Sequence, residues 1–151
     1  DNTLKIETDA GMQTRLFHFG AWKAPAPAKP SWQGDSVAEW ESGGRGGPTT
    51  GSAPGTSEGG GGGGRRFGNL KVVTRNMRPG YLRKNGVPYS ADTVLTEYWD
   101  LYRETNGDQY IVITTYVDDP KYLQQTYVTS PNFQKEADGS KWDPTPCSAK
   151  W

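Results

Sequence analysis

Residues 110–117 read Tyr-Ile-Val-Ile-Thr-Thr-Tyr-Val, and the dipeptide Asn106-Gly107 stands shortly before them. Asn-Gly is a preferred sequence for the tight turn of a β-hairpin, because both turn positions require positive φ angles. Successive side chains of a strand point to opposite faces, and here both faces carry apolar or β-branched side chains. We therefore predict a hairpin whose strand at 110–117 lies in the centre of a sheet.

The segment that precedes this turn, 93–102, is apolar and aromatic, and we predict a strand there as well. Four of its side chains would also suit one face of a helix, namely Leu95, Tyr98, Trp99 and Tyr102.

Short alternating segments bounded by turn residues recur along the rest of the chain. Further strands are expected at 3–8, 12–19, 37–41, 70–75, 122–129 and 133–136. The first two would form a hairpin about Asp9-Ala10-Gly11. The three prolines within 20–31 predict an extended connector, and the turn signals within 76–90 predict an irregular loop. About eight short strands without a helix predict an all-β fold, either an antiparallel sandwich or a partly open barrel.

The strand segments 31–42 and 69–75 are separated by a spacer that contains six consecutive glycines, Gly59–Gly64. Glycine has no side chain to pack and loses the most conformational entropy on ordering. We therefore predict that 43–66 is a flexible glycine-rich insertion, forming a long surface loop in a single β domain that spans 1–151.

Composition and charge limit the classes of function. Seventeen basic residues balance seventeen acidic ones, so net charge predicts neither a nucleic acid nor a membrane surface as partner. No run of about 20 apolar residues exists, so no transmembrane segment is expected. Local charge is less even, because 65–84 contains no acidic residue. Its candidate interaction residues are Arg65, Arg66, Arg75, Arg78, Arg83 and Lys84.

Few residues are suited to nucleophilic catalysis, which needs a base beside the nucleophile. The only histidine is His18, and the candidate nucleophiles Ser36 and Ser90 lack an elbow motif. The glycines at 59–64 precede a strand rather than the Lys-Ser or Lys-Thr of a phosphate-binding loop. A hydrolase is therefore the third choice of function.

Carboxylates at turns are weak candidates for a calcium site, namely Asp108, Asp118 and Asp119. The same positions favour carboxylates for turn geometry alone, so we expect no metal and no cofactor. A pair of carboxylates for glycoside hydrolysis could be drawn from Glu97, Asp100, Asp118 and Asp119.

Aromatic residues favour binding over catalysis, because the chain has six tryptophans and eight tyrosines. Trp22, Trp32 and Trp142 fall in predicted loops, where exposed rings can stack on a sugar. The alternative is that the aromatic residues build the core. Phe67 and Tyr81 in the basic segment could stack on single-stranded nucleic acid, but no nucleic-acid partner is expected.

Several segments, in this order, resemble a family of uncharacterised bacterial secreted proteins that is frequent in acidobacteria. The segments are 12–15, 30–41, 70–74, 77–90, 95–98, 114–120 and 122–123. The resemblance implies a secreted, periplasmic or cell-surface location, and it implies no activity, cofactor or catalytic residue. Members of the family join the strand that ends near Glu41 to the next strand by a tighter connection than the spacer found here.

The family resemblance also implies an upstream segment before residue 1, which in members of the family often contains a cysteine. Cys147 is the single cysteine of this chain, so it can form no intrachain disulfide. It could instead pair with the upstream segment or with a partner chain.

Together these features predict a noncatalytic extracytoplasmic structural or interaction component. Short strands leave edges that another chain could pair with, so we expect a homo-oligomer or filament assembled through strand edges. The alternative is a module that binds a carbohydrate or another small ligand.

Overall fold

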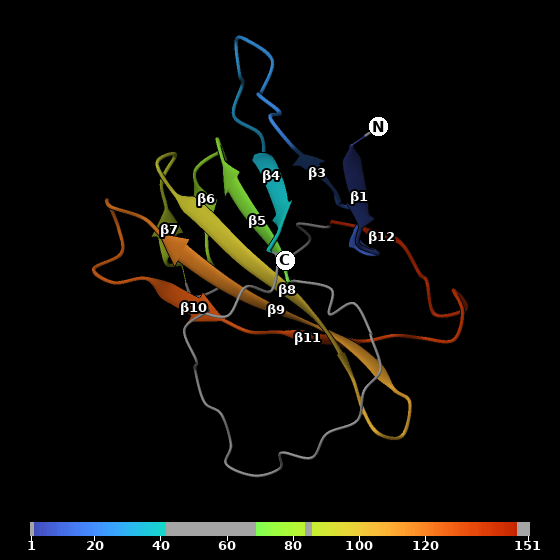
Figure 1. Ribbon diagram of the computed structural model, residues 1–151. Coiled ribbons are helices and arrows are strands. Elements are labelled where there is room, and N and C mark those ends of the chain that lie inside the picture. The colour runs from blue at the N-terminus through green and yellow to red at the C-terminus, as the bar shows by residue number, and fades with distance from the viewer. Residues whose placement is uncertain (1, 42–68, 84–85, 148–151) are drawn as a thin grey trace.

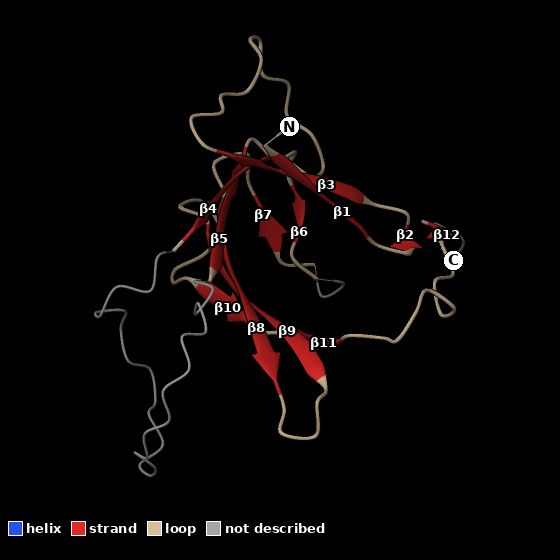
Figure 2. Ribbon diagram, turned by 45° about the vertical axis from the view of Figure 1, so that its right-hand side comes forward, coloured by secondary structure: helices blue, strands red, loops and turns tan. Residues whose placement is uncertain are grey.

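The computed structural model describes residues 2–41, 69–83 and 86–147, and within these ranges the chain forms strands and no helix (Figure 1, Figure 2). Accordingly, no described segment is a helix that could cross a membrane. The strands are β1 (Thr3–Glu7), β2 (Ala10–Gly11), β3 (Thr14–Phe19), β4 (Asp35–Trp40), β5 (Leu70–Arg75), β6 (Gly80–Tyr81), β7 (Pro88–Tyr89), β8 (Val94–Arg103), β9 (Gln109–Asp118), β10 (Tyr127–Thr129), β11 (Asn132–Gln134) and β12 (Thr145–Pro146).

Eight of these strands form one main sheet in the order β1-β3-β4-β5-β8-β9-β10, with β11 also paired to β9. Neighbouring strands run antiparallel except β3 and β4, which are parallel. A parallel pair needs a crossover connection, and the proline-containing segment between β3 and β4 provides it. β4 and β5 pair along their full lengths, so the chain on both sides of the glycine-rich spacer belongs to one sheet. The insertion predicted at 43–66 lies outside the described residues.

The prediction of an all-β, mostly antiparallel fold is confirmed. The main sheet does not close into a barrel, and its arrangement is consistent with a β sandwich. β9 lies between β8 on one side and β10 and β11 on the other, as predicted for a central strand. β8 is a ten-residue strand, so the helical alternative for 93–102 is wrong.

Three predicted segments differ from the structure. The strand expected within 31–42 begins only at Asp35. The strand expected at 122–129 begins only at Tyr127, because the carboxylate of Asp119 accepts hydrogen bonds from the backbone N–H groups of Lys121 and Tyr122 and holds a turn there. The loop expected at 76–90 contains the small hairpin of β6 and β7. Another two-stranded sheet, formed by β2 and β12, lies at the tip of the first hairpin.

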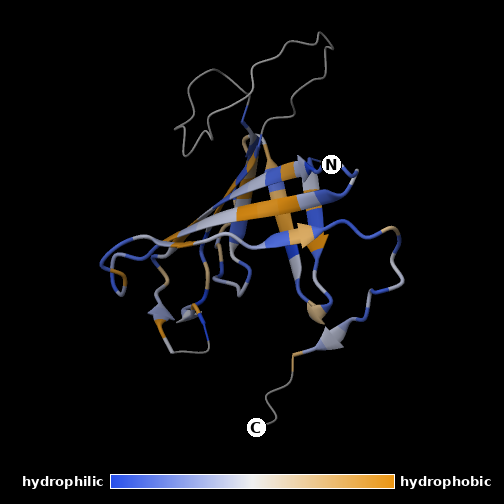
Figure 3. Cartoon of the chain, turned by 90° about the horizontal axis from the view of Figure 1, so that it is seen from below, coloured by the Kyte–Doolittle hydropathy of each residue, from blue (hydrophilic) through white to orange (hydrophobic). Residues whose placement is uncertain are grey.

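The strand register defines an inner face of the main sheet, which carries Phe17, Val72, Glu97 and Val117 among others. Its apolar core consists of Phe17, Ala38, Leu70 and Val72, with Ile6, Phe19 and Trp99 packed against them. Figure 3 shows hydrophobic stretches along the strands of this sheet and mostly hydrophilic colours on the loops.

The inner face is concave. β3 and β8 are separated by β4 and β5, which would place them about 14 Å apart in a flat sheet. The rings of Phe17 on β3 and Trp99 on β8 nevertheless meet edge to face, with centroids 5.4 Å apart. The sheet must therefore curl strongly across these four strands.

An ion pair spans the same concave face. The guanidinium of Arg15 on β3 donates to both carboxylate oxygens of Glu97 on β8, at 2.9 and 2.5 Å. One Arg15 nitrogen also donates to Thr74 Oγ1 at 3.3 Å, and the Ser36 and Thr74 hydroxyls share a hydrogen bond of 2.7 Å. The Glu97 side chain is only 7% exposed and that of Arg15 19%, so the pair is largely withdrawn from water.

We predict that removing one partner of this ion pair costs more stability than removing both. Glu97→Leu leaves a buried guanidinium without its carboxylate and should lower the free energy of unfolding by about 3 kcal/mol. The double variant Arg15→Met/Glu97→Leu should lose less stability than Glu97→Leu alone, and so less than the sum of the two single variants. Urea denaturation measures all three.

Lys71→Met is the matched control, because it removes a partner of the exposed Lys71–Glu39 pair and should change stability by less than about 1 kcal/mol. Additive losses in the double variant would contradict a coupled, buried pair.

Candidate functional site

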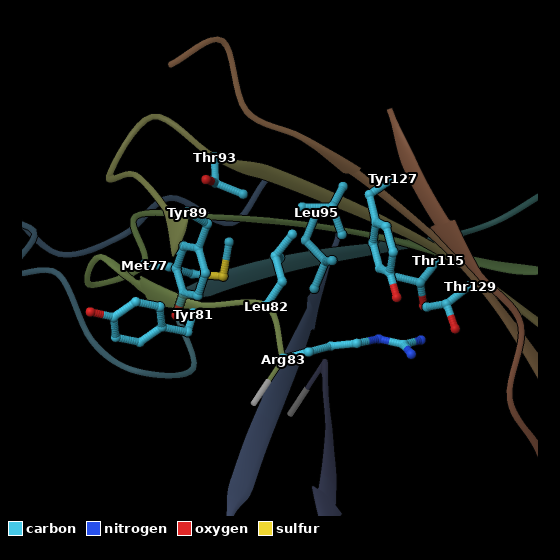
Figure 4. Close-up of a pocket in the computed structure, with 11 residues that line it drawn as sticks. Met77, Tyr81, Leu82, Arg83, Tyr89, Thr93, Leu95, Thr115, Tyr127 and Thr129 are labelled. Carbon is cyan, nitrogen blue, oxygen red and sulfur yellow. The ribbon is translucent and has the colours of Figure 1, made fainter. Parts of the chain in front are cut away.

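A pocket of about 280 Å³ lies on the inner face, at the end where β8, β9 and β10 face the hairpin of β6 and β7 (Figure 4). The sheet supplies side chains that alternate inward along three neighbouring strands. The hairpin and its approach supply the opposite wall. The lining residues are Met77, Tyr81, Leu82, Arg83, Tyr89, Thr93, Leu95, Thr115, Val117, Tyr127 and Thr129.

Backbone contacts hold the hairpin wall in place. Gly80 pairs with Tyr89, and a Cβ atom at Gly80 would lie 2.9 to 3.0 Å from the Tyr89 ring, so glycine permits this close approach. Leu82 N donates to Val87 O at 2.8 Å and continues the pairing. At the base of the hairpin, Arg78 N donates to Ser31 O at 2.8 Å, which ties the wall to the crossover segment.

Asp119 anchors the other side of the pocket. The residue is buried, with 3% of its surface exposed, and its carboxylate accepts hydrogen bonds from the backbone N–H of Ser90 and from the hydroxyl of Thr93. It also accepts from the N–H groups of Lys121 and Tyr122 at 2.8 and 2.9 Å. A single carboxylate therefore joins the turn before β8 to the turn after β9 and positions Thr93 at the pocket.

The hydrogen bonds to Asp119 also decide its protonation. Burial alone would raise the pKa of this carboxyl, but the four donors stabilise the ionised form and hold the pKa well below its usual range. Asp119 is thus an anion that stabilises the fold.

The pocket is lined by apolar side chains together with a few polar groups. Leu95 and Val117 face each other across β8 and β9, and Leu82 and Met77 lie on the hairpin side. The phenol of Tyr89 is a neutral hydrogen-bond donor near pH 7, and burial raises its pKa further. Arg83 lies over the ring of Tyr127, with its guanidinium carbon 5.4 Å from the ring centroid.

The three tryptophans predicted to bind a ligand lie outside this pocket. Trp22 stacks on His18 with ring centroids 4.0 Å apart. Trp32 is 62% exposed and lies beneath the guanidinium of Arg78, and Trp142 is 52% exposed in the segment before β12. Within the described chain, no ring contact joins any two of the three.

The predicted basic interaction residues are only partly described. Arg65, Arg66 and Lys84 lie outside the described residues. The other three have separate neighbours. Arg75 is exposed at the end of β5, Arg78 donates to Pro30 O, and Arg83 lines the pocket.

The carboxylates considered for calcium or for glycoside hydrolysis are occupied by other partners. Asp118 accepts from Thr126, and Asp108 accepts from Asn106 at 2.9 Å. Glu97 binds Arg15 on the inner face, whereas Asp100, three residues along β8, points to the opposite face, where burial raises its pKa. Across the residues that the structure describes, no group of three or more metal-ligating side chains occurs.

The candidate nucleophiles and the histidine have separate environments. Ser36 Oγ is buried against Thr74, and Ser90 Oγ accepts from Asp92 N at 3.1 Å. His18 shares a hydrogen bond of 3.0 Å with Thr3 Oγ1. Among the hydrogen bonds of the described residues, none joins the imidazole to either serine. Cys147 is exposed as a free thiol beside Gly11, and its predicted pairing stays a prediction.

Sequence reasoning missed the pocket because it interpreted 76–90 as an irregular loop. The segment contains Tyr81, Leu82 and Tyr89 near the turn dipeptide Asn85-Gly86. That dipeptide between apolar residues is a hairpin signal and could have located the wall.

Comparison of the chain with protein-family models, with curated proteins and with solved structures gave no match. The family resemblance of the sequence therefore stays a prediction, and the site rests on its own geometry.

We predict that Asp119→Asn destabilises the protein at pH 7 by about 3 kcal/mol, because it removes a charged acceptor of four hydrogen bonds. The pKa of Asp119 in the folded state lies below its unfolded value of about 3.9, so the folded state binds fewer protons. Its contribution is present above about pH 4 and is lost as the pH falls further. Urea denaturation between pH 3 and 7 measures this.

The variant should show a flatter decline in stability below about pH 4 than the wild type. Asp138→Asn, at an exposed turn carboxylate whose pKa is also lowered by hydrogen bonds to Ser140, is the control and should change stability little. An unchanged acid dependence in the Asp119 variant would contradict the assignment.

Proposed function

We propose that the protein acts by binding and that its inner-face pocket holds a small, ring-shaped apolar molecule that carries a carboxylate. The single observation that carries this proposal is the composition of the pocket. Apolar side chains of Leu82, Leu95 and Val117 line it together with three tyrosine rings and one arginine. A few placed polar groups in an apolar concavity are typical of small-molecule sites.

The size of the pocket supports a small ligand. Liquid water occupies about 30 Å³ per molecule, so 280 Å³ corresponds to about nine non-hydrogen atoms. This matches one aromatic or sugar-sized ring with a substituent. A lipid chain or an oligosaccharide would have to extend beyond the lining residues.

Arg83 supports an anionic substituent. None of the ion pairs among the described residues involves its guanidinium, which lies over the Tyr127 ring beside the pocket. A guanidinium in that position offers two parallel N–H donors to a carboxylate, and this geometry favours a planar acid over an alcohol of the same size.

The experiment compares benzoate and phenylacetate with benzyl alcohol, using chemical-shift changes in the protein and calorimetry. We expect the acids to bind and to shift resonances of Leu95, Val117 and Thr129. Arg83→Gln should weaken binding of the acids by at least about tenfold, the loss of one charge-assisted hydrogen bond, and should leave the alcohol unchanged.

Two further variants sharpen the test. Leu95→Trp fills the pocket and should abolish binding of acids and alcohol alike. Arg103→Gln, at an exposed arginine at the end of β8, is the matched control and should bind like the wild type. Shifts that map to Trp22, Trp32 or Trp142 would place the site elsewhere and contradict the proposal.

A further inference from the structure

β1 is the outermost strand of the main sheet, and its position at the edge is visible in Figure 1. Within the described part of the chain, β3 is its only strand partner. The opposite edge of the sheet differs, because two strands of three residues each, β10 and β11, cover β9 there. β1 therefore offers the longer continuous edge.

The hydrogen bonds to β3 show which backbone groups of β1 remain available. Phe19 N donates to Asn2 O, and Thr8 N donates to Gln13 O. In this antiparallel register the even-numbered residues of β1 face β3, so N–H and C=O of Thr3, Lys5 and Glu7 point away from the sheet.

We propose that β1 is a self-association surface, on which β1 of a second copy of this chain pairs antiparallel with Lys5 opposite Glu7 of that copy. The two-fold axis then passes between the two Ile6 residues. Both Lys5 and Glu7 belong to the outward-facing set, so each Lys5–Glu7 pair exchanges two backbone hydrogen bonds. The interface is isologous, and it does not depend on the proposed ligand.

Charge selects this register over its neighbours. The side chains of Lys5 and Glu7 are 56% and 51% exposed, on the outer face. Moving the second copy by two residues places Lys5 opposite Lys5 in one direction and Glu7 opposite Glu7 in the other, and both pairs repel. Moving it by four, in the direction that first pairs Lys5 with Lys5, places Lys5 opposite Thr3, so neither glutamate faces a cation of the other copy. Only the register centred on Ile6 puts opposite charges together without also placing like charges opposite each other.

The apolar side chains agree with the same pairing. Leu4 is 41% exposed at the sheet edge although it lies on the inner face, opposite the fully buried Phe17. Ile6, on the same face, packs against the core cluster. In the proposed dimer the two Ile6 side chains become a cross-strand pair, and each Leu4 is covered by the neighbouring strand. The concave core of one copy then continues into that of the other.

The proposal is tested with charge-reversal variants, whose dimer dissociation constants are measured by sedimentation velocity over a concentration series. Lys5→Glu places two carboxylates opposite each other in both pairs, and Glu7→Lys places two ammonium groups there. Each should raise the dimer dissociation constant by at least about tenfold. The double exchange Lys5→Glu/Glu7→Lys restores opposite charges and should restore the dimer.

Lys141→Glu reverses a charge in another exposed ion pair, Lys141–Glu136, and should leave the dimer intact. Hydrogen exchange adds a readout of register, because the amides of Lys5 and Glu7 should be protected only in the dimer. A wild-type protein that stays monomeric would overturn the proposal. So would a dimer that survives both single reversals, because another surface or another segment would then form the contact.

Discussion

The ion pair of Arg15 with Glu97 is the contact on which the shape of the sheet depends. It joins two strands that a flat sheet would hold far apart, and it does so by two hydrogen bonds in a largely water-excluded place. Thr115 lies opposite Glu97 in the register and lines the pocket. The ion pair that bridges the curled face therefore lies next to a side chain that lines the pocket.

The inner face has two parts, an apolar core and a pocket. On one side Phe17, Val72 and their neighbours fill the concavity with apolar side chains. On the other side the hairpin of β6 and β7 covers β8, β9 and β10 and leaves a pocket. Asp119 stabilises this second part, because its hydrogen bonds join the turn before β8 to the turn after β9, at the same end of the strand pair. Apolar side chains pack one end of the inner face, and the β6–β7 hairpin covers the other end. This arrangement lets a short chain keep a small cavity beside a close-packed core.

Local patterns predicted the strands well, since alternation and turn dipeptides act within a few residues. The β8–β9 pair and the first hairpin follow directly from such signals. The parallel pairing of β3 with β4, the contact of Arg15 with Glu97 and the pocket were not predictable in this way. They join residues far apart in sequence, and their formation depends on how the whole sheet curls. Asp119 was considered as a metal ligand because turn carboxylates and calcium ligands share the same local pattern.

Charged side chains at a sheet edge usually oppose uncontrolled pairing, because most registers bring like charges together or bury one charge alone. Lys5 and Glu7 fit that role, and their mutual ion pair of 2.8 Å satisfies both charges in a single copy. The same two charges also leave one register in which each meets its opposite. Lys5 and Glu7 therefore disfavour most pairings of another strand with β1 but still allow one register. An exposed strand edge can therefore still select one pairing register. The edge has only five residues, and these include both charged side chains and the apolar Ile6 between them.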